Sequence, residues 1–347
     1  MNIVISIEHP AWAHQFQGII KQLRQDGHRV LVLAVRKEMD LTLLEYYGIA
    51  FTLIARSTGR NIVQKAWLLL YTSIRYFLCA RKFRADLFIG RASPMMAIAS
   101  RLLGKPHILF EDTDHAVVGL FFCRLFSASI LTTKTFKKNM GKNHRRVNTF
   151  KELFYLHPDH FTPDPASLGL VGLKQGDLFF IVRFVAWEAD HDLGHKGLSI
   201  ETKRTVVEEL GKLGRVFISS EKELPSEFEA YRMLLPPEKI HDLIYYATLL
   251  YGESATMAAE AAVLGTHSIF CYFTGLGSIT ELENAYQLVY NFRLSSASQR
   301  KSVSMATALA SEPDIWTLGK EKRKHLLAEK GNGMSMFLKE IRRFSGV

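Results

Sequence analysis

The segment Gly252–Thr266, GESATMAAEAAVLGT, combines residue types that could bind a phosphate group. Apolar runs at 249–251 and 268–270 flank it, so we expect a strand, a turn, a helix that stops at a glycine, and a second strand. Ser254 and Thr256 are followed by alanine-rich sequence that favours a helix beginning at the turn. Such a helix start presents unpaired backbone N–H groups and the positive end of the helix dipole, and both attract phosphate.

Glu260 lies one turn beyond Thr256 on the same face of this predicted helix. A carboxylate there could accept hydrogen bonds from the hydroxyls of a ribose whose phosphates rest on the helix start. The alternative is a core helix capped by Ser254 or Thr256, with Glu260 in solvent. The candidate binding residues of the segment are Gly252, Glu253, Ser254, Thr256, Met257 and Glu260.

Other polar residues follow predicted strands, where ligands of open α/β sheets bind. They are Glu8, His9 and His14 after the first strand, Glu111, Asp112, Asp114 and His115 after the fifth, and Gly275, Gly277, Thr280, Glu281 and Asn284 after the strand at 269–273. His9 and His14, expected in a loop over 8–14, titrate near neutrality and could deprotonate a sugar hydroxyl. Glu111 or Asp112 could orient them, one of these two carboxylates could itself be the base, and a purely structural role is the alternative. The candidates for catalysis are His9, His14, Asp112 and His115.

The segment 183–197, RFVAWEADHDLGHKG, is too polar for an ordinary short turn between a strand and a helix. Arg183, His191 and Lys196 could bind a diphosphate, the arginine through a two-pronged contact and the lysine as a point charge. His191, Asp192 and His195 could instead be metal ligands, although no metal motif with helical histidine spacing is present. Surface salt bridges are the third alternative. We expect neither a metal nor a cofactor.

The composition, 48% hydrophobic and 22% charged over 347 residues, is that of a globular protein. The three cysteines are far apart, which indicates a reducing compartment, and the N-terminus reads as a strand rather than a signal peptide. Residues 1–165 contain 23 of the 44 Lys and Arg but 12 of the 34 Asp and Glu, a net charge of +11. This excess indicates an anionic partner for the first half: nucleic acid, a membrane surface or a phosphate-bearing acceptor.

Apolar strands alternate with helical segments in both halves, and a proline-containing connector lies near 151–174. We therefore predict an α/β protein with two Rossmann-like domains facing across a cleft, at 1–165 and 166–330, and a last helix in 331–347 that packs back toward the first domain. A long helix is expected at 61–82, with aromatic and basic residues that suit either a membrane interface or packing on the sheet. An apolar stretch follows at 117–126.

The run of Gly252, Ser254, Thr256, Glu260 and Leu264-Gly265 resembles the GT-B superfamily, which contains nucleotide-sugar glycosyltransferases and non-hydrolysing UDP-N-acetylglucosamine 2-epimerases. The resemblance implies a diphosphate at the turn and a ribose at Glu260. The chain also resembles an uncharacterised family of archaea and bacterial surface-polysaccharide gene clusters, which implies this fold but no reaction. The segments that match are His9-Pro10 with His14, Gly27-His28, Glu111-Asp112-Thr113 with His115-Ala116, Tyr155-Leu156 with Phe161-Thr162-Pro163-Asp164, Arg183-Phe184 to His191-Asp192, and Gly252–Thr266.

Two departures bear on the activity that the resemblance implies. The His-Arg-x-x-Glu-Asn segment of typical epimerases is replaced by residues 187–192, WEADHD, and the glycine-rich first loop of the lipid-linked peptidoglycan GlcNAc transferase by residues 8–14, EHPAWAH. The expected function is a cytoplasmic glycosyltransferase that uses a UDP-sugar, at or near the inner face of the membrane, with a lipid-linked or phosphate-bearing acceptor and no nucleic acid partner. The alternatives are an epimerase-like enzyme and a non-enzymatic protein that binds anions or nucleic acid.

Overall fold

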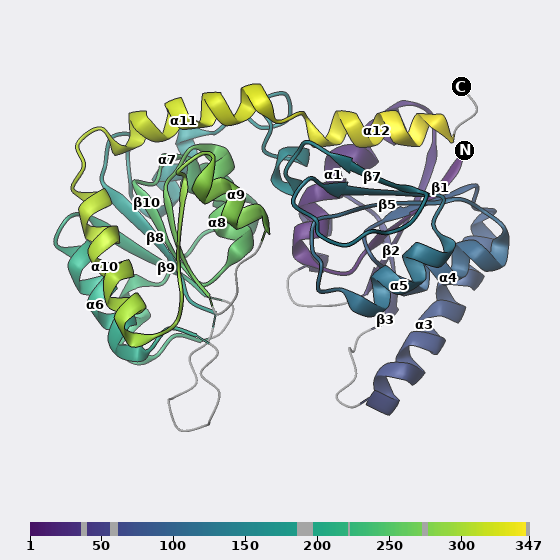
Figure 1. Ribbon diagram of the computed structural model, residues 1–347, viewed down its shortest axis with the longest axis horizontal. Coiled ribbons are helices and arrows are strands. Elements are labelled where there is room, and N and C mark those ends of the chain that lie inside the picture. The colour runs from purple at the N-terminus through teal and green to yellow at the C-terminus, as the bar shows by residue number, and fades with distance from the viewer. Residues whose placement is uncertain (36–39, 56–61, 186–196, 221–222, 273–276, 345–347) are drawn as a thin grey trace. The chain divides into compact units, whose positions relative to one another are not determined.

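The computed structural model describes residues 1–35, 40–55, 62–185, 197–220, 223–272 and 277–344. The chain forms two compact units. Unit 1 contains Met1–His160 and Lys330–Val347, and unit 2 contains Phe161–Glu329. Each unit is built on one parallel sheet with helices between the strands (Figure 1), so the predicted α/β class with two Rossmann-like domains is confirmed.

The sheet of unit 1 has the strand order β3-β2-β1-β4-β5-β6-β7. Its strands are β1 (Asn2–Ile7), β2 (Arg29–Val35), β3 (Phe51–Ala55), β4 (Leu87–Gly90), β5 (His107–Glu111), β6 (Ser129–Thr133) and β7 (His144–Val147). The chain moves outward from β1 in one direction and, after β3, from β4 in the other. The order therefore reverses between β1 and β4, and ligands of such sheets bind beyond the strand ends at that point.

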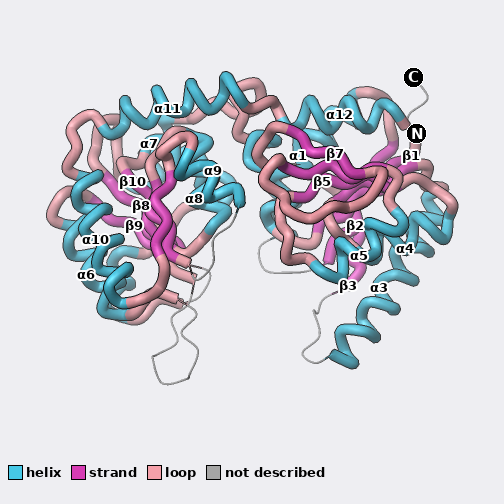
Figure 2. Tube along the Cα trace, viewed as in Figure 1, coloured by secondary structure: helices cyan, strands magenta, loops and turns pink. Residues whose placement is uncertain are grey.

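Helices cover both faces of this sheet (Figure 2). They are α1 (Pro10–Gln25), α2 (Asp40–Tyr46), α3 (Ile62–Phe83), α4 (Pro94–Leu103), α5 (Val117–Phe126) and, from the end of the chain, α12 (Gly333–Arg343), with the 3-10 helix η1 (Lys151–Phe154). The right-handed rule for parallel crossovers assigns α3, α4 and α5 to one face and α1 and α2 to the other. In agreement with this, α4 contacts both α3 and α5, and α1 contacts α2 and α12.

The helix α12 belongs to unit 1 although it follows unit 2 in the chain. Phe337 packs against Phe16 and Phe154, with ring centroids 6.2 and 5.9 Å away. The carboxylate of Glu340 is buried, accepts a hydrogen bond of 2.6 Å from Ser129 Oγ and pairs with Arg145. This helix therefore supplies both apolar and charged contacts to the core of unit 1.

The sheet of unit 2 has the order β12-β11-β10-β8-β9 and reverses between β8 and β10. Its strands are β8 (Phe179–Arg183), β9 (Arg215–Ser219), β10 (Leu249–Gly252), β11 (Ser268–Cys271) and β12 (Val289–Phe292). Its helices are η2 (Pro165–Val171), α6 (Ile200–Gly211), η3 (Ser226–Tyr231), η4 (Pro237–Lys239), α7 (Ile240–Tyr246), α8 (Ala255–Leu264), α9 (Gly277–Asn284), α10 (Ser296–Ala310) and α11 (Ile315–Glu329). All residues of β10 and β11 and the first four of β8 are buried, as expected for the central strands of a parallel sheet.

Three features of the fold differ from the sequence expectations. The boundary between the units follows His160, five residues before the predicted one. The helix α1 begins at Pro10 rather than near residue 15, because His9 caps it and Pro10 takes the first helical position, where proline needs no N–H partner. The strand β7 was not predicted, because His144–Val147 lies at the sheet edge with two exposed arginines and lacks an apolar pattern.

Candidate functional site

The ends of β8 and β10 meet at the reversal point of the unit 2 sheet. Arg183 ends β8, and Gly252 pairs with it at the end of β10. A Cβ atom on Gly252 would lie 2.2 Å from the carbonyl oxygen of Arg183, so only glycine fits there. The backbone that leads into α8 therefore lies directly beside the end of β8.

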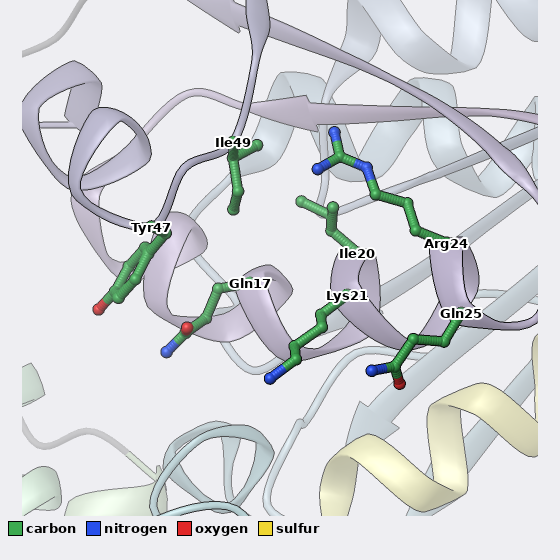
Figure 3. Close-up of a pocket in the computed structure, with 7 residues that line it drawn as sticks. All are labelled: Gln17, Ile20, Lys21, Arg24, Gln25, Tyr47 and Ile49. Atoms are coloured by element: carbon green, nitrogen blue, oxygen red, sulfur yellow. The ribbon is translucent and has the colours of Figure 1, made fainter.

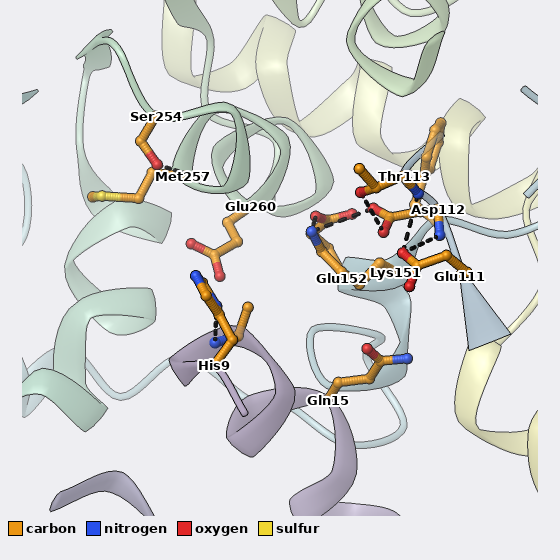
Figure 4. Close-up of polar contacts among 12 residues, drawn as sticks. His9, Gln15, Glu111, Asp112, Thr113, Lys151, Glu152, Ser254, Met257 and Glu260 are labelled. Atoms are coloured by element: carbon orange, nitrogen blue, oxygen red, sulfur yellow. Dashed lines mark hydrogen bonds and ion pairs between the residues drawn. The ribbon is translucent and has the colours of Figure 1, made fainter. Parts of the chain in front are cut away.

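The helix α8 begins at this point with the cap that the sequence predicts. Ser254 has extended backbone angles, and its Oγ accepts a hydrogen bond of 3.4 Å from the Met257 N–H (Figure 4). Thr256 is half-buried, and Gly265 in a left-handed conformation ends the helix. The first turn of α8 is thus a fixed N-terminus of a ten-residue helix at the position where α/β sheets bind phosphate.

Glu260 is buried within unit 2, so the alternative that it lies in solvent is wrong. Its side chain is 5% exposed, and its Oε1 lies 3.0 Å from Nε2 of His241 on α7. The ring of His241 packs edge-on against Phe161 at 6.2 Å. His241 was not predicted as a site residue, because IHDLIYY is typical of an ordinary packed helix and gives no signal of a histidine–carboxylate pair.

Glu253 makes contacts within unit 2 that the sequence did not suggest. Its carboxylate accepts hydrogen bonds from the backbone N–H groups of Val185 at 2.8 Å and Leu198 at 2.5 Å. It also faces Lys203 Nζ at 4.0 Å, and both side chains are buried. Val185 follows the end of β8 and Leu198 precedes the start of α6, so Glu253 links these two elements.

The other predicted binding residues of unit 2 are only partly placed. Arg183 is half-buried, and its guanidinium donates a hydrogen bond of 3.1 Å to Ser219 Oγ at the end of β9. Glu281 lies half-buried on α9. His191 and Lys196 lie outside the described residues, as do Asp192, His195 and Gly275.

In unit 1, His9 lies at the end of β1 beside the reversal point, where it caps α1. Its Nδ1 accepts a hydrogen bond of 3.2 Å from the Ala11 N–H. A neutral imidazole that accepts at Nδ1 has its proton on Nε2, so in this geometry Nε2 is a donor rather than a base. His14 lies on α1 instead of in the predicted loop, with Nδ1 2.7 Å from the Tyr47 hydroxyl and its ring stacked on Tyr155 at 5.6 Å.

Arg91 is at the centre of a buried charge cluster beyond the ends of β4 and β5. Figure 4 shows three other members of the cluster, Glu111, Asp112 and Lys151. The guanidinium of Arg91 forms ion pairs with Glu111 and Asp112, and Lys151 Nζ lies 3.3 Å from Asp112 Oδ2. Burial alone would raise the pKa of Asp112, but the charges of Arg91 and Lys151 outweigh it and hold the pKa well below its usual range. A carboxylate held in this way is a weak base, so the cluster favours a structural role for Asp112.

His115, the fourth candidate for catalysis, is exposed before α5. Its neighbour Asp114 accepts hydrogen bonds from the backbone N–H groups of Lys137 and Lys138. A groove of about 370 Å³ lies along α1, and the sequence did not suggest it. Figure 3 shows the residues that line it. Its lining combines Lys21 and Arg24 with Tyr47, whose hydroxyl contacts His14.

The described residues contain neither a metal-binding cluster nor a membrane-spanning helix. No group of three or more His, Cys, Asp and Glu side chains in this part of the chain is arranged to hold a metal ion. Across the same residues, no helix is long and apolar enough to cross a membrane.

No protein-family model matches the chain, and no curated protein matches its sequence. The resemblance to the narrower uncharacterised family therefore stays a prediction. Solved structures match nearly the full length. S. aureus MnaA with UDP is 9% identical, covers 99% of this chain and 97% of its own, and has a TM-score of 0.68. A UDP-N-acetylglucosamine 2-epimerase is 10% identical, with coverages of 93% and 90% and a TM-score of 0.66.

The glycosyltransferase VinC, solved with dTDP, is 11% identical, covers 100% of both chains and has a TM-score of 0.65. At such low identities the likeness shows the fold alone. The fold is that of these glycosyltransferases and epimerases, which confirms the predicted GT-B-like fold.

Proposed function

We propose that the protein is a glycosyltransferase of GT-B type that uses a UDP-sugar as donor. The observation that carries the proposal is the start of α8, where Ser254 caps a helix at the sheet reversal point. Gly252, just before the cap, pairs with Arg183, and Glu260 lies one turn beyond Thr256 on the same helix. The helix start and Arg183 would bind the diphosphate and stabilise it as it leaves, and Glu260 would bind the ribose. The structures of MnaA with UDP and VinC with dTDP support a nucleotide diphosphate as ligand of this fold.

Unit 1 would bind the acceptor in this proposal. Its positive charge suits a lipid-linked or phosphate-bearing acceptor in the synthesis of a surface polysaccharide or glycolipid, at the inner face of the membrane. Among the predicted catalytic residues, Asp112 forms ion pairs that argue for a structural role. His9 caps α1 through Nδ1, so its Nε2 carries the proton and acts as a hydrogen-bond donor. His9 would then donate a hydrogen bond to the acceptor, and His14 with Tyr47 is the better candidate for proton transfer.

An epimerase-like enzyme is the second candidate, because a UDP-N-acetylglucosamine 2-epimerase has the same fold. It needs only a soluble UDP-sugar, whereas a glycosyltransferase needs an acceptor as well. Incubation of the protein with UDP-N-acetylhexosamines, with and without a membrane lipid extract, separates the two. Release of UDP that depends on the extract supports transfer, and conversion of the sugar without the extract supports epimerisation.

Replacing Glu260 with Ala is expected to weaken UDP binding roughly five- to 150-fold, because lost hydrogen bonds to a desolvated ribose cost about 1–3 kcal/mol. Isothermal titration calorimetry with UDP measures the change. Glu312→Ala is a matched control, since Glu312 is exposed in unit 2 and outside the candidate site.

The pair between Glu260 and His241 provides a second comparison. His241→Asn removes the imidazole but leaves the carboxylate, so it should weaken UDP binding less than Glu260→Ala does. Unchanged UDP affinity in a folded Glu260→Ala protein would show that the carboxylate serves only the packing of α7 on α8, and the ribose assignment would fail.

A further inference from the structure

The outer surface of α3 exposes a continuous apolar stripe. Its members recur at helical spacing and are between 43% and 67% exposed. They are Trp67, Leu70, Tyr71, Ile74 and Leu78. The buried side of the same helix, which includes Tyr76 and Ala80, already packs on the sheet of unit 1. The exposed stripe is therefore additional apolar surface that the fold of unit 1 leaves in contact with water.

The helices beside α3 extend this surface. On α5, four side chains at helical spacing are between 56% and 65% exposed, and Leu102 at the end of α4 is 65% exposed. The four are Val117, Val118, Phe121 and Leu125. Since α4 contacts both α3 and α5, the three helices form one layer (Figure 1). Exposed apolar groups of this size, gathered on one layer, are typical of interaction sites.

The charge of this layer indicates what it contacts. The three helices contain six Lys and Arg residues and no Asp or Glu. Arg81, Lys82, Arg101 and Arg124 are exposed among the apolar side chains. A protein partner or a second copy of this chain would ordinarily meet a mixed set of charges, whereas a surface with only positive charge around apolar groups matches an anionic lipid bilayer.

A basic loop lies beside the same layer. Phe136 and Met140 of the loop between β6 and β7 pack with Leu120 and Cys123 of α5 in one core cluster. The loop exposes Lys134, Lys137, Lys138 and Lys142. Asp114, the acidic residue just before α5, is engaged with the backbone of this loop. The loop thus adds four positive charges next to the apolar stripe of α5.

We propose that the outer surface of α3, α4 and α5 is a docking surface for an anionic membrane, with Trp67 and Phe121 as the side chains that enter the interface. The lysines and arginines bind lipid phosphates, and the two apolar stripes lie among the acyl chains nearest the headgroups. The lipid-linked acceptor of the proposed function gives the surface a purpose, but its geometry and charge are independent of the donor site.

The test is sedimentation of the purified protein with vesicles of phosphatidylcholine, with and without phosphatidylglycerol, at low and high salt. The protein should pellet with the anionic vesicles and be released by salt, because headgroup attraction is screened within about 10 Å at 0.1 M salt. Trp67→Ser combined with Phe121→Ser should lower vesicle binding roughly tenfold or more. Neutralising the four lysines of the loop, or Arg81, Arg101 and Arg124, should lower it on the order of 10- to 100-fold.

Leu234→Ser and Leu170→Ser are matched controls, since both leucines are exposed in unit 2 and should not affect vesicle binding. Vesicles with brominated acyl chains should quench the fluorescence of Trp67, and Trp67→Phe should remove that quenching. The proposal is overturned if the control variants lose as much vesicle binding as the Trp67→Ser/Phe121→Ser protein, or if that double variant binds vesicles as well as the wild type. It is also overturned if the wild-type protein is a dimer that the double variant dissociates, because the surface would then bind a second copy of the chain. UDP titrations on the same samples report separately on the donor site, so either proposal can fail without the other.

Discussion

Replacing Arg91 with Met is expected to destabilise unit 1 by about 3–5 kcal/mol, because it leaves Glu111 and Asp112 buried without their main cation. Arg91 also donates to Gln15 Oε1 at 3.2 Å, and methionine provides no donor for any of these oxygens. Lys151 can compensate for only one of the carboxylates. Because the chain has two units, hydrogen exchange followed by peptide is the appropriate measurement, and the loss should appear in β4, β5 and β1.

Arg101→Met is the control for this prediction, since Arg101 is exposed on α4 and its loss should cost less than about 1 kcal/mol. Arg91→Lys keeps one charge but cannot reach all three partners, so its effect should lie between the two. If Arg91→Met exchanges like the wild type in these strands, the cluster does not hold unit 1 together.

The same cluster predicts an acid dependence. The pKa of Asp112 is lowered in the folded protein, since Arg91 and Lys151 outweigh its burial. A carboxyl group with a lowered folded pKa contributes stability that is fully present above its ordinary pKa of about 4 and is lost as the pH falls further. Wild-type unit 1 should therefore lose protection below about pH 4, and Arg91→Met should lack this contribution already at neutral pH.

Replacing Glu253 with Ala should destabilise unit 2 by roughly 3 kcal/mol, because two charge-assisted hydrogen bonds to backbone N–H groups disappear at a buried position. The change also removes the carboxylate that faces Lys203 Nζ at 4.0 Å. Faster hydrogen exchange at the end of β8 and the start of α6 would show the loss. UDP affinity should fall as well, since Gly252 and Ser254 adjoin the same carboxylate.

Glu208→Ala tests whether any lost carboxylate has this effect, since Glu208 is exposed on α6 and its replacement should stay within about 0.5 kcal/mol. If the amides of Val185 and Leu198 exchange as slowly in Glu253→Ala as in the wild-type protein, water replaces the carboxylate at no cost in stability. Glu253 would then be available as a ligand-binding residue, as the sequence first suggested.

The elements that carry strong local signals were predictable from the sequence. The apolar run at 249–251, the small residues of the turn and Gly265 define β10, the cap of α8 and its end, and the structure has all three. Ser93 followed by Pro94 likewise marks the start of α4. Such signals are local because caps and strand runs depend on residues within one turn or one strand.

The contacts of the candidate site were less predictable, because long-range packing decides them. Nothing near Glu260 in the sequence indicates that its carboxylate lies against His241, 19 positions earlier. Similarly, Glu253 resembles a ligand-binding residue in its turn, yet it holds backbone N–H groups 68 and 55 residues away. The exposure of Trp67 and Phe121 was also undecidable, since an apolar stripe on a helix is more often buried.

The return of α12 to unit 1 has a consequence for biosynthesis. Unit 2 is one continuous stretch of chain, so it can fold as soon as it leaves the ribosome. Unit 1 begins earlier but cannot bury Phe16 and Phe154 under Phe337, or satisfy Ser129 with Glu340, until all of unit 2 has been made. The first unit to be translated is therefore the last to be completed, and while it waits, its exposed α12 site is a natural target for a chaperone.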